Sequence, residues 1–300
     1  RSYEGGDLAA HALGYVGEIS EAELSRPRYA GYQMGDLVGK AGLESYYDQD
    51  LTGVKGWKQV IVNSLGRELR ELPAGRHPVS GNSLRLTLDL DLQRELEAGY
   101  ADKNGSAVFL DPDTGEILAL VSRPAYDPNV FARRFSASEW VNLVNSEAHP
   151  LQNRAIQSKF APGSVFKIVL AIAALEAGKA GPGRTDFCPG SAVIYGRRFL
   201  CHEEGGHGTV AMVEAIQRSC NVYFYHLGRD LGISLISQWA RNLGFGSRTG
   251  VDLMHEEAGT VPDEAWKRRT RNEPWYPGET ISVSIGHGAL EVTPIQMASF

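Results

Sequence analysis

From residue 83 onward, apolar and polar positions first alternate and then recur at helical spacing. Residues 84–88 alternate leucine with polar side chains, which predicts a half-buried strand. Leu92, Leu96 and Tyr100 then recur every four residues, which predicts a helix capped by Asp89 or Asp91. Two apolar runs follow, at 106–111 and 116–122, and the Gly-containing turn between them predicts an antiparallel hairpin. Ser136 and Glu139 have capping-box spacing and predict a further helix start.

The most apolar segment is residues 162–178. Pro162 suits the first turn of a helix and Gly178 suits its end, while the interior is apolar on nearly every face. Such a helix is expected in the middle of a protein.

The first eighty residues have a different pattern, because they are polar, glycine-punctuated and lack a long apolar period. Short strands and helices are expected there. A turn-rich stretch at 73–82 marks a boundary, so we expect a non-catalytic module at 1–82 and a second domain at 83–300.

The charge composition argues against one class of binding partner. The 300 residues carry a net charge of −6, the wrong sign for neutralising a phosphate backbone, so no nucleic-acid partner is expected. No run of eighteen apolar residues occurs. The chain begins at Arg1 without Met, and we expect that an upstream segment is missing.

Within the apolar segment, Ser164 and Lys167 are polar and three positions apart, on one face of a helix. Burial disfavours an ammonium group, so this lysine is expected to have a lowered pKa and to accept the serine proton. The alternative is that Ser164 is only a helix cap and that Lys167 reaches solvent from the helix end.

A serine enzyme with an amine leaving group needs a second proton relay, which a Ser-x-Asn sequence on a loop can supply. Ser80-Gly81-Asn82 lies in the turn-rich boundary, where such residues usually form a turn. Ser219-Cys220-Asn221 lies between a helix-like and an aromatic run, and is the stronger candidate.

These motifs resemble the Ser-x-x-Lys and Ser-x-Asn signature of penicillin-binding proteins and serine β-lactamases. Further segments resemble class B penicillin-binding proteins, and their GHG and SCN elements look most like the elongation type. The segments are AHALGYVG (10–17), LVGKAGLE (37–44), GRE (66–68), LDPDTGEILA (110–119), PAYDPN (124–129), NRA (153–155), PGSVFK (162–167), GHG (206–208), SCNVYFY (219–225), SIGHG (284–288) and TPIQ (293–296).

The resemblance implies an α/β (α+β) fold, with a transpeptidase domain built as an antiparallel sheet flanked by helices, and a smaller N-terminal pedestal. It implies a peptidoglycan D,D-transpeptidase that cross-links stem peptides during cell-wall elongation and is acylated by β-lactams. Ser164 would be the nucleophile and Lys167 the general base. Ser219 would relay a proton, and Asn221 would hold the acyl amide. Gly286 and Gly288 would line the substrate.

The same resemblance implies an enzyme on the periplasmic face of the inner membrane, held by a single N-terminal anchor outside this chain. Its expected partners are a SEDS-type glycan polymerase and cell-shape scaffold proteins. No Lys-Thr-Gly follows Asn221. The family's third motif is therefore expected beyond Phe300.

A metal site is also predicted. Cys188, Cys201, His207 and Cys220 fall within 33 residues (188 to 220), and three thiolates with one imidazole suit tetrahedral zinc. Asp186 or His202 could replace one ligand. The chemistry itself needs no cofactor, and the alternative is a set of buried thiols, with or without a disulfide.

Two other functions stay open on sequence grounds. A serine β-lactamase shares the nucleophile but must also deacylate with water, and no glutamate motif for that step is evident. A non-catalytic β-lactam sensor or elongation-complex scaffold would be compatible with the absence of the third motif.

Overall fold

The computed structural model describes residues 2–100, 102–133 and 136–300. The chain divides into two compact units, Arg1–Gln152 with Asp252–Met254, and Asn153–Val251 with His255–Phe300.

The first unit begins with short elements joined by glycine turns, as predicted. Strands β1 (Val16–Glu18) and β2 (Leu37–Gly39) pair antiparallel and pack over a small core of Ile19, Tyr29 and Val38. The short helices around them are α1 (Ala10–Leu13), α2 (Glu21–Leu24), α3 (Gly42–Tyr46) and α4 (Asp48–Leu51), with a 3₁₀ turn at Pro27–Tyr29.

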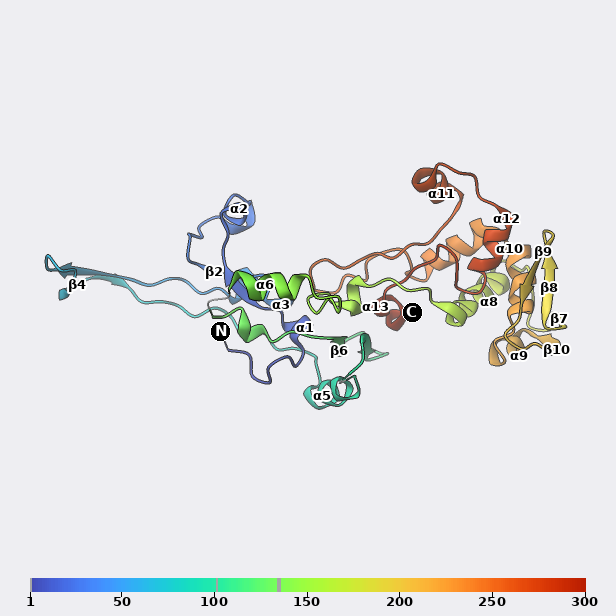
Figure 1. The fold of residues 1–300 in the computed structure, drawn as a ribbon, viewed down its shortest axis with the longest axis horizontal. Coiled ribbons are helices and arrows are strands. Elements are labelled where there is room, and N and C mark those ends of the chain that lie inside the picture. The colour runs from blue at the N-terminus through green and yellow to red at the C-terminus, as the bar shows by residue number, and fades with distance from the viewer. Residues whose placement is uncertain (1, 101, 134–135) are drawn as a thin grey trace. The chain divides into compact units, whose positions relative to one another are not determined.

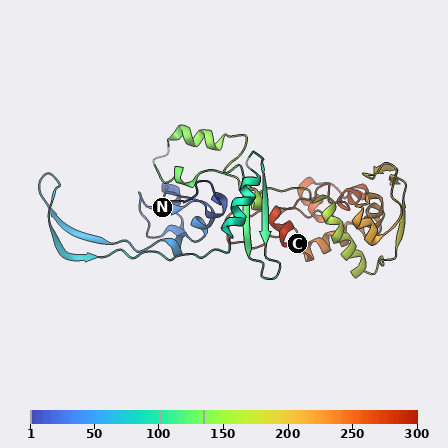
Figure 2. The ribbon, with the colours of Figure 1, turned by 90° about the horizontal axis from the view of Figure 1, so that it is seen from below.

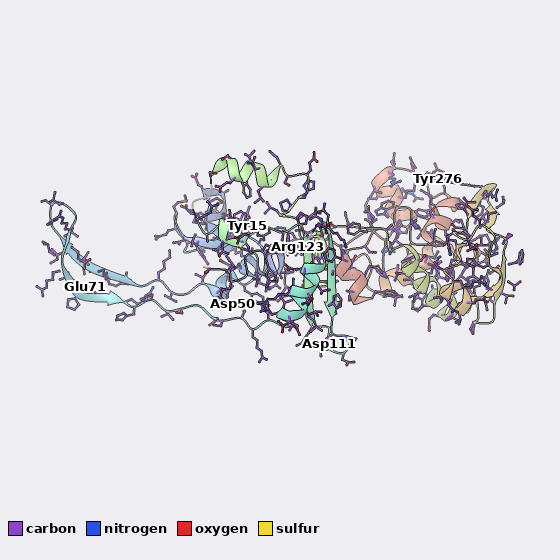
Figure 3. The ribbon with its side chains drawn as sticks, turned by 60° about the horizontal axis from the view of Figure 1, so that its bottom comes forward. Tyr15, Asp50, Glu71, Asp111, Arg123 and Tyr276 are labelled. Carbon is purple, nitrogen blue, oxygen red and sulfur yellow. The ribbon has the colours of Figure 1, made fainter. Side chains whose placement is uncertain are left out.

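A long hairpin of β3 (Trp57–Val62) and β4 (Glu68–Arg76) extends from this unit (Figure 1). Its side chains are largely exposed, including Trp57, Leu65 and Leu69. Figure 3 shows Glu71 on this hairpin, where it forms an ion pair with Lys58.

Helix α5 (Leu90–Gly99) starts as predicted, because the Asp89 carboxylate accepts the backbone N–H groups of Asp91 and Leu92. It lies against the hairpin of β5 (Gly105–Leu110) and β6 (Ile117–Arg123), which is also predicted (Figure 2). Buried Glu97 joins the two elements through an ion pair with Arg123, at 2.6 Å.

The predicted strand at residues 84–88 is wrong. Among the hydrogen bonds of the described residues, this segment bonds to β6 through the Thr87 hydroxyl, at the Ile117 carbonyl, and the adjacent Asp89 N–H bonds to the Leu118 carbonyl. Alternating leucines are thus present without the repeated backbone ladder that defines a strand.

Helix α6 (Ala137–Val144) has the predicted capping box, in which Ser136 and Glu139 bond to each other's backbone N–H groups. A 3₁₀ turn at Pro128–Val130 precedes it. Trp140, Val141 and Val144 on this helix are exposed.

The second unit has a helical core. Helix α8 (Lys167–Glu176) packs beside the long helix α10 (Asn221–Asn242), and α12 (Pro277–Val283) also contacts α10 (Figure 1). Phe166, Leu170, Phe224 and Leu227 are among its fully buried side chains. The other helices of this unit are α7 (Arg154–Gln157), α9 (Met212–Gln217), α11 (Glu264–Arg271) and α13 (Pro294–Ser299).

Two antiparallel strand pairs complete the unit. Strand β7 (Thr185–Cys188) pairs with β10 (Gly208–Ala211), and β8 (Ser191–Ile194) pairs with β9 (Arg197–Leu200). Among the described residues, every sheet consists of two antiparallel strands. The mixed helix and sheet character agrees with the predicted fold class.

The apolar segment at 162–178 differs in two ways from the predicted buried helix. Its first turn, Gly163–Phe166, is a 3₁₀ helix, and the α-helix begins only at Lys167. Val165, Ile168 and Leu175 are more than one third exposed. Gly178 ends the helix in the left-handed conformation, as predicted.

No helix of the described residues combines the length and apolar character that crossing a membrane requires.

Candidate active site

Ser164 lies in the 3₁₀ turn that precedes α8. Its side chain is exposed, as is that of Val165, whereas Phe166 and Lys167, two and three residues later, are buried. The Gly163 N–H donates to the Gly286 carbonyl at 3.0 Å, which ties the residue before Ser164 to a distant loop. The turn therefore presents one hydroxyl to solvent from an otherwise anchored backbone.

Lys167 is 1% exposed, and its amine is fully engaged. Its Nζ donates to the Ser219 carbonyl at 2.8 Å, to Ser219 Oγ at 2.9 Å and to Asn221 Oδ1 at 2.7 Å. Burial lowers the pKa of Lys167 from 10.5 to about 8, against the opposing effect of the Cys201 and Cys220 thiols. Roughly one amine in ten is thus uncharged at pH 7 and able to accept a proton, and the neutral form becomes the major one above about pH 8.

Ser219 has a left-handed backbone, with φ of 52°. It follows the C-cap of α9, where the Ser219 N–H bonds to Ile216 and the Cys220 N–H bonds to Ala215. This pattern is the Schellman motif, and glycine is the usual residue at its left-handed position. A serine in that conformation is strained, as residues at functional sites often are.

Ser219 joins the other two residues. Its hydroxyl donates to Ser164 Oγ at 2.8 Å and accepts from Lys167 Nζ at 2.9 Å. The sequence predicted a direct pair of Ser164 and Lys167. Among the hydrogen bonds of the described residues, the connection instead runs through Ser219. Since hydroxyl protons rotate freely, this chain can carry a proton from Ser164 to the amine.

Asn221 is the first residue of α10. Its Oδ1 accepts from Lys167, and its Nδ2 donates to the Leu200 carbonyl at 3.4 Å. The Tyr225 hydroxyl donates to the same carbonyl at 3.0 Å. The structure therefore brings together all four predicted catalytic residues. The sequence did not indicate Leu200, because a backbone acceptor has no signature in sequence.

The four predicted metal ligands also lie together. The ligand atoms of Cys188, Cys201, His207 and Cys220 all fall within 4.8 Å of one another. His207 Nδ1 is 3.6 Å from Cys188 Sγ and 3.5 Å from Cys201 Sγ. All three cysteines are free and buried, so no disulfide forms.

The two alternative ligands are placed differently. Asp186 bonds to His226 at 3.0 Å and to Arg184 at 3.1 Å. His202 is exposed, and its Nδ1 is 3.9 Å from Cys201 Sγ. Neither belongs to the cluster of four ligand atoms.

The two glycines predicted to line the substrate follow α12. Gly286 is buried and Gly288 is exposed, and both have positive φ. Their substrate-binding role stays a prediction.

Two family models match this chain. The family model of the penicillin-binding protein transpeptidase domain matches residues 105–300, and that of the penicillin-binding protein dimerisation domain matches residues 1–86. The chain belongs to the penicillin-binding protein transpeptidase family. The predicted family is thereby confirmed.

Curated relatives place it further within the family. The chain is 41% identical over 300 residues to the peptidoglycan D,D-transpeptidase MrdA of Acinetobacter baumannii, covering 99% of this chain and 44% of the relative. It is 38% identical over 304 residues to MrdA of Escherichia coli, covering 99% and 48%. The chain thus spans about half the length of the curated relatives it matches.

Solved structures of the family have the same fold. Penicillin-binding protein PBP2 of Helicobacter pylori, in a complex with MreC, has a TM-score of 0.89 at 35% identity, covering 98% of this chain and 55% of that one. PBP2 of Pseudomonas aeruginosa, in complex with WCK 5153, has a TM-score of 0.84 at 33% identity, covering 99% and 62%.

Because the backbone of Ser219 is strained, a glycine there should be better tolerated by the fold than an alanine, although both remove the hydroxyl that activity needs. Ser219→Gly and Ser219→Ala both remove the hydroxyl, but only glycine adopts the left-handed backbone without a steric cost. We expect the glycine variant to be more stable than the alanine variant by about 1 kcal/mol, measured as a melting temperature a few degrees higher. Both should lose reactivity at Ser164. Equal melting temperatures would show that the backbone at 219 carries no strain.

Proposed function

We propose that this chain is the catalytic part of a peptidoglycan D,D-transpeptidase that works through a serine acyl-enzyme during cell-wall elongation. The observation that carries the proposal is the hydrogen-bond chain from Lys167 through Ser219 to Ser164. Relatives named D,D-transpeptidase and matched over 99% of the chain support the same activity.

In this mechanism Ser164 Oγ attacks the penultimate D-alanine carbonyl of a stem peptide. Its proton passes through Ser219 to the neutral amine of Lys167, and returns by the same path to the leaving D-alanine amine. The bond to D-alanine breaks as the ester to Ser164 forms. An amine of a second stem peptide then takes the acyl group and releases the serine. Asn221 holds the acyl amide, and Gly286 and Gly288 line the substrate.

The same nucleophile accounts for covalent binding of β-lactams, since opening of the lactam leaves an ester on Ser164 with no group released. A β-lactamase would use the same first step but would hydrolyse the ester quickly. A non-catalytic sensor would retain the ester on Ser164.

The organisation of the protein is part of the proposal. Residues 1–82 would form the pedestal and residues 83–300 the transpeptidase domain, a division supported by the two family models. Neighbouring structures include PBP2 with MreC and a peptidoglycan synthase complex. By that analogy the partners are a cell-shape scaffold protein and a SEDS-type glycan polymerase, at the periplasmic face of the inner membrane, with an N-terminal anchor.

The proposed serine nucleophile is tested by mass spectrometry of the intact, complete natural protein after incubation with penicillin. We expect a gain of one drug mass in the wild type and none in Ser164→Ala. Ser191→Ala, at a serine of β8, is the control and should acylate like the wild type. Absence of an adduct in the wild type would contradict the proposal, and rapid loss of the adduct would favour a β-lactamase.

We further propose that Cys188, Cys201, His207 and Cys220 hold a structural zinc ion. In a tetrahedral site with ordinary zinc distances, a sulfur and a nitrogen ligand are about 3.5 Å apart. The separations of 3.5 and 3.6 Å between His207 Nδ1 and two of the sulfurs fit that value. Cys220 stands between Ser219 and Asn221, so an ion there would fix the loop that aims both side chains. The ion would take no part in the chemistry.

The zinc proposal predicts about one zinc per chain in protein purified without chelators, measured by elemental analysis. His207→Ala should lose most of the metal. His202→Ala is the matched control, because this neighbouring histidine lies outside the cluster, and it should retain the metal. Less than a few tenths of a zinc per wild-type chain, or equal loss in both variants, would rule out the assigned ligand set.

A further inference from the structure

The loop that follows α12 touches both halves of the candidate active site. Its Gly286 carbonyl accepts the N–H of Gly163, the residue before Ser164, at 3.0 Å. Two residues earlier, Ser284 packs against Gly228 of α10, the helix that begins at Asn221. Residues 284–286 thus lie between the turn that carries the nucleophile and the helix that carries Asn221.

The contact at Gly286 leaves no room for a side chain. A Cβ atom there would lie 2.1 Å from the Gly163 carbonyl oxygen and 2.6 Å from the Gly163 nitrogen. Both are backbone atoms, which cannot rotate away as a side chain can. Even an alanine at 286 would therefore displace the turn of Ser164 or the loop itself.

The contact at Gly228 is equally close on the other side. A Cβ atom at Gly228 would lie 2.3 Å from Ser284 Cβ and 3.0 Å from Ser284 Oγ. Ser284 is fully buried, and its hydroxyl donates to the Ile281 carbonyl at 2.7 Å. That hydrogen bond holds Ser284 at the end of α12. The contact between Ser284 and Gly228 therefore sets the distance between the loop and α10.

We propose that residues 284–286 act as a positioning segment, which sets the distance between the Ser164 turn and α10. Gly286 and Gly228 are positioning residues in this arrangement, since they keep Ser164 Oγ within 2.8 Å of Ser219 Oγ. The inference rests on the proposed function, because it assigns these glycines to alignment of the acylation step. A displacement of about 1 Å in such a site can cost about 100-fold in rate.

The first test compares two glycines with the same positive φ. Gly286 and Gly196 both have φ of 75°, but a Cβ at Gly196, in the β8–β9 turn, would meet nothing within 4 Å. Alanine at either position has to adopt a positive φ, whereas only Gly286→Ala meets the Ser164 turn. We expect Gly286→Ala to slow acylation by penicillin about 100-fold, with the loss in the acylation step rather than in initial binding. Gly196→Ala should acylate at the wild-type rate.

The second test uses compensation, so that it does not depend on the folding of Gly286→Ala. Gly228→Ala should slow acylation strongly, because its Cβ meets that of Ser284. Adding Ser284→Gly removes the two nearest atoms and leaves Leu170 at an ordinary 3.6 Å. We expect the double variant to be acylated faster than Gly228→Ala. This gain should exceed any change that Ser284→Gly alone makes to the wild-type rate.

All rates are measured in the complete natural protein, well below each variant's melting temperature, so that a loss of stability alone does not change them. Three results would overturn the positioning role while leaving the proposed function intact. They are a wild-type acylation rate in Gly286→Ala, an equal loss of rate in Gly196→Ala, and no recovery of rate in the double variant. A wild type that penicillin does not acylate would overturn both.

Discussion

The candidate site depends on one buried amine. Lys167 is almost completely withdrawn from water, yet its Nζ meets three oxygen atoms of Ser219 and Asn221. Burial destabilises the ammonium form, while the three acceptors and nearby thiols stabilise it. Burial is the larger effect, and the pKa falls to about 8. The balance leaves an amine that is poised to take up and give back a proton near neutral pH.

The rest of the second unit is arranged around this amine. Ser219 reaches it only because the end of α9 turns through a left-handed residue, and Asn221 reaches it because α10 starts two positions later. Between them, Cys220 points into the cluster of three thiols and His207. The loop after α12 holds the opposite side, where Ser164 turns into α8. Three separate segments, at 163–167, 219–221 and 284–286, thus meet around one hydrogen-bond chain, whose members are therefore far apart in the sequence.

The sequence predicted the members of the site better than their connections. Ser164 and Lys167 are three residues apart, so any helical turn brings them to one face, and Ser219 and Asn221 were recognised by motif. The bridging position of Ser219 was not predicted, because it depends on a tertiary contact between α8 and the end of α9. The cap at Ser136 was predicted correctly, and Asp89 is one of the two caps predicted for α5, since capping is local. The strand expected at 84–88 was not found, because a strand needs a partner that alternation alone cannot supply.

The account is tested most directly by titrating the Lys167 amine in the folded, unacylated protein by NMR, with the signal assigned by its loss in Lys167→Met. The prediction is a midpoint near pH 8, so that the neutral amine becomes the major form above that pH. A midpoint at or above the ordinary lysine value of 10.5 would contradict it, because the amine would then stay charged and could not serve as the base.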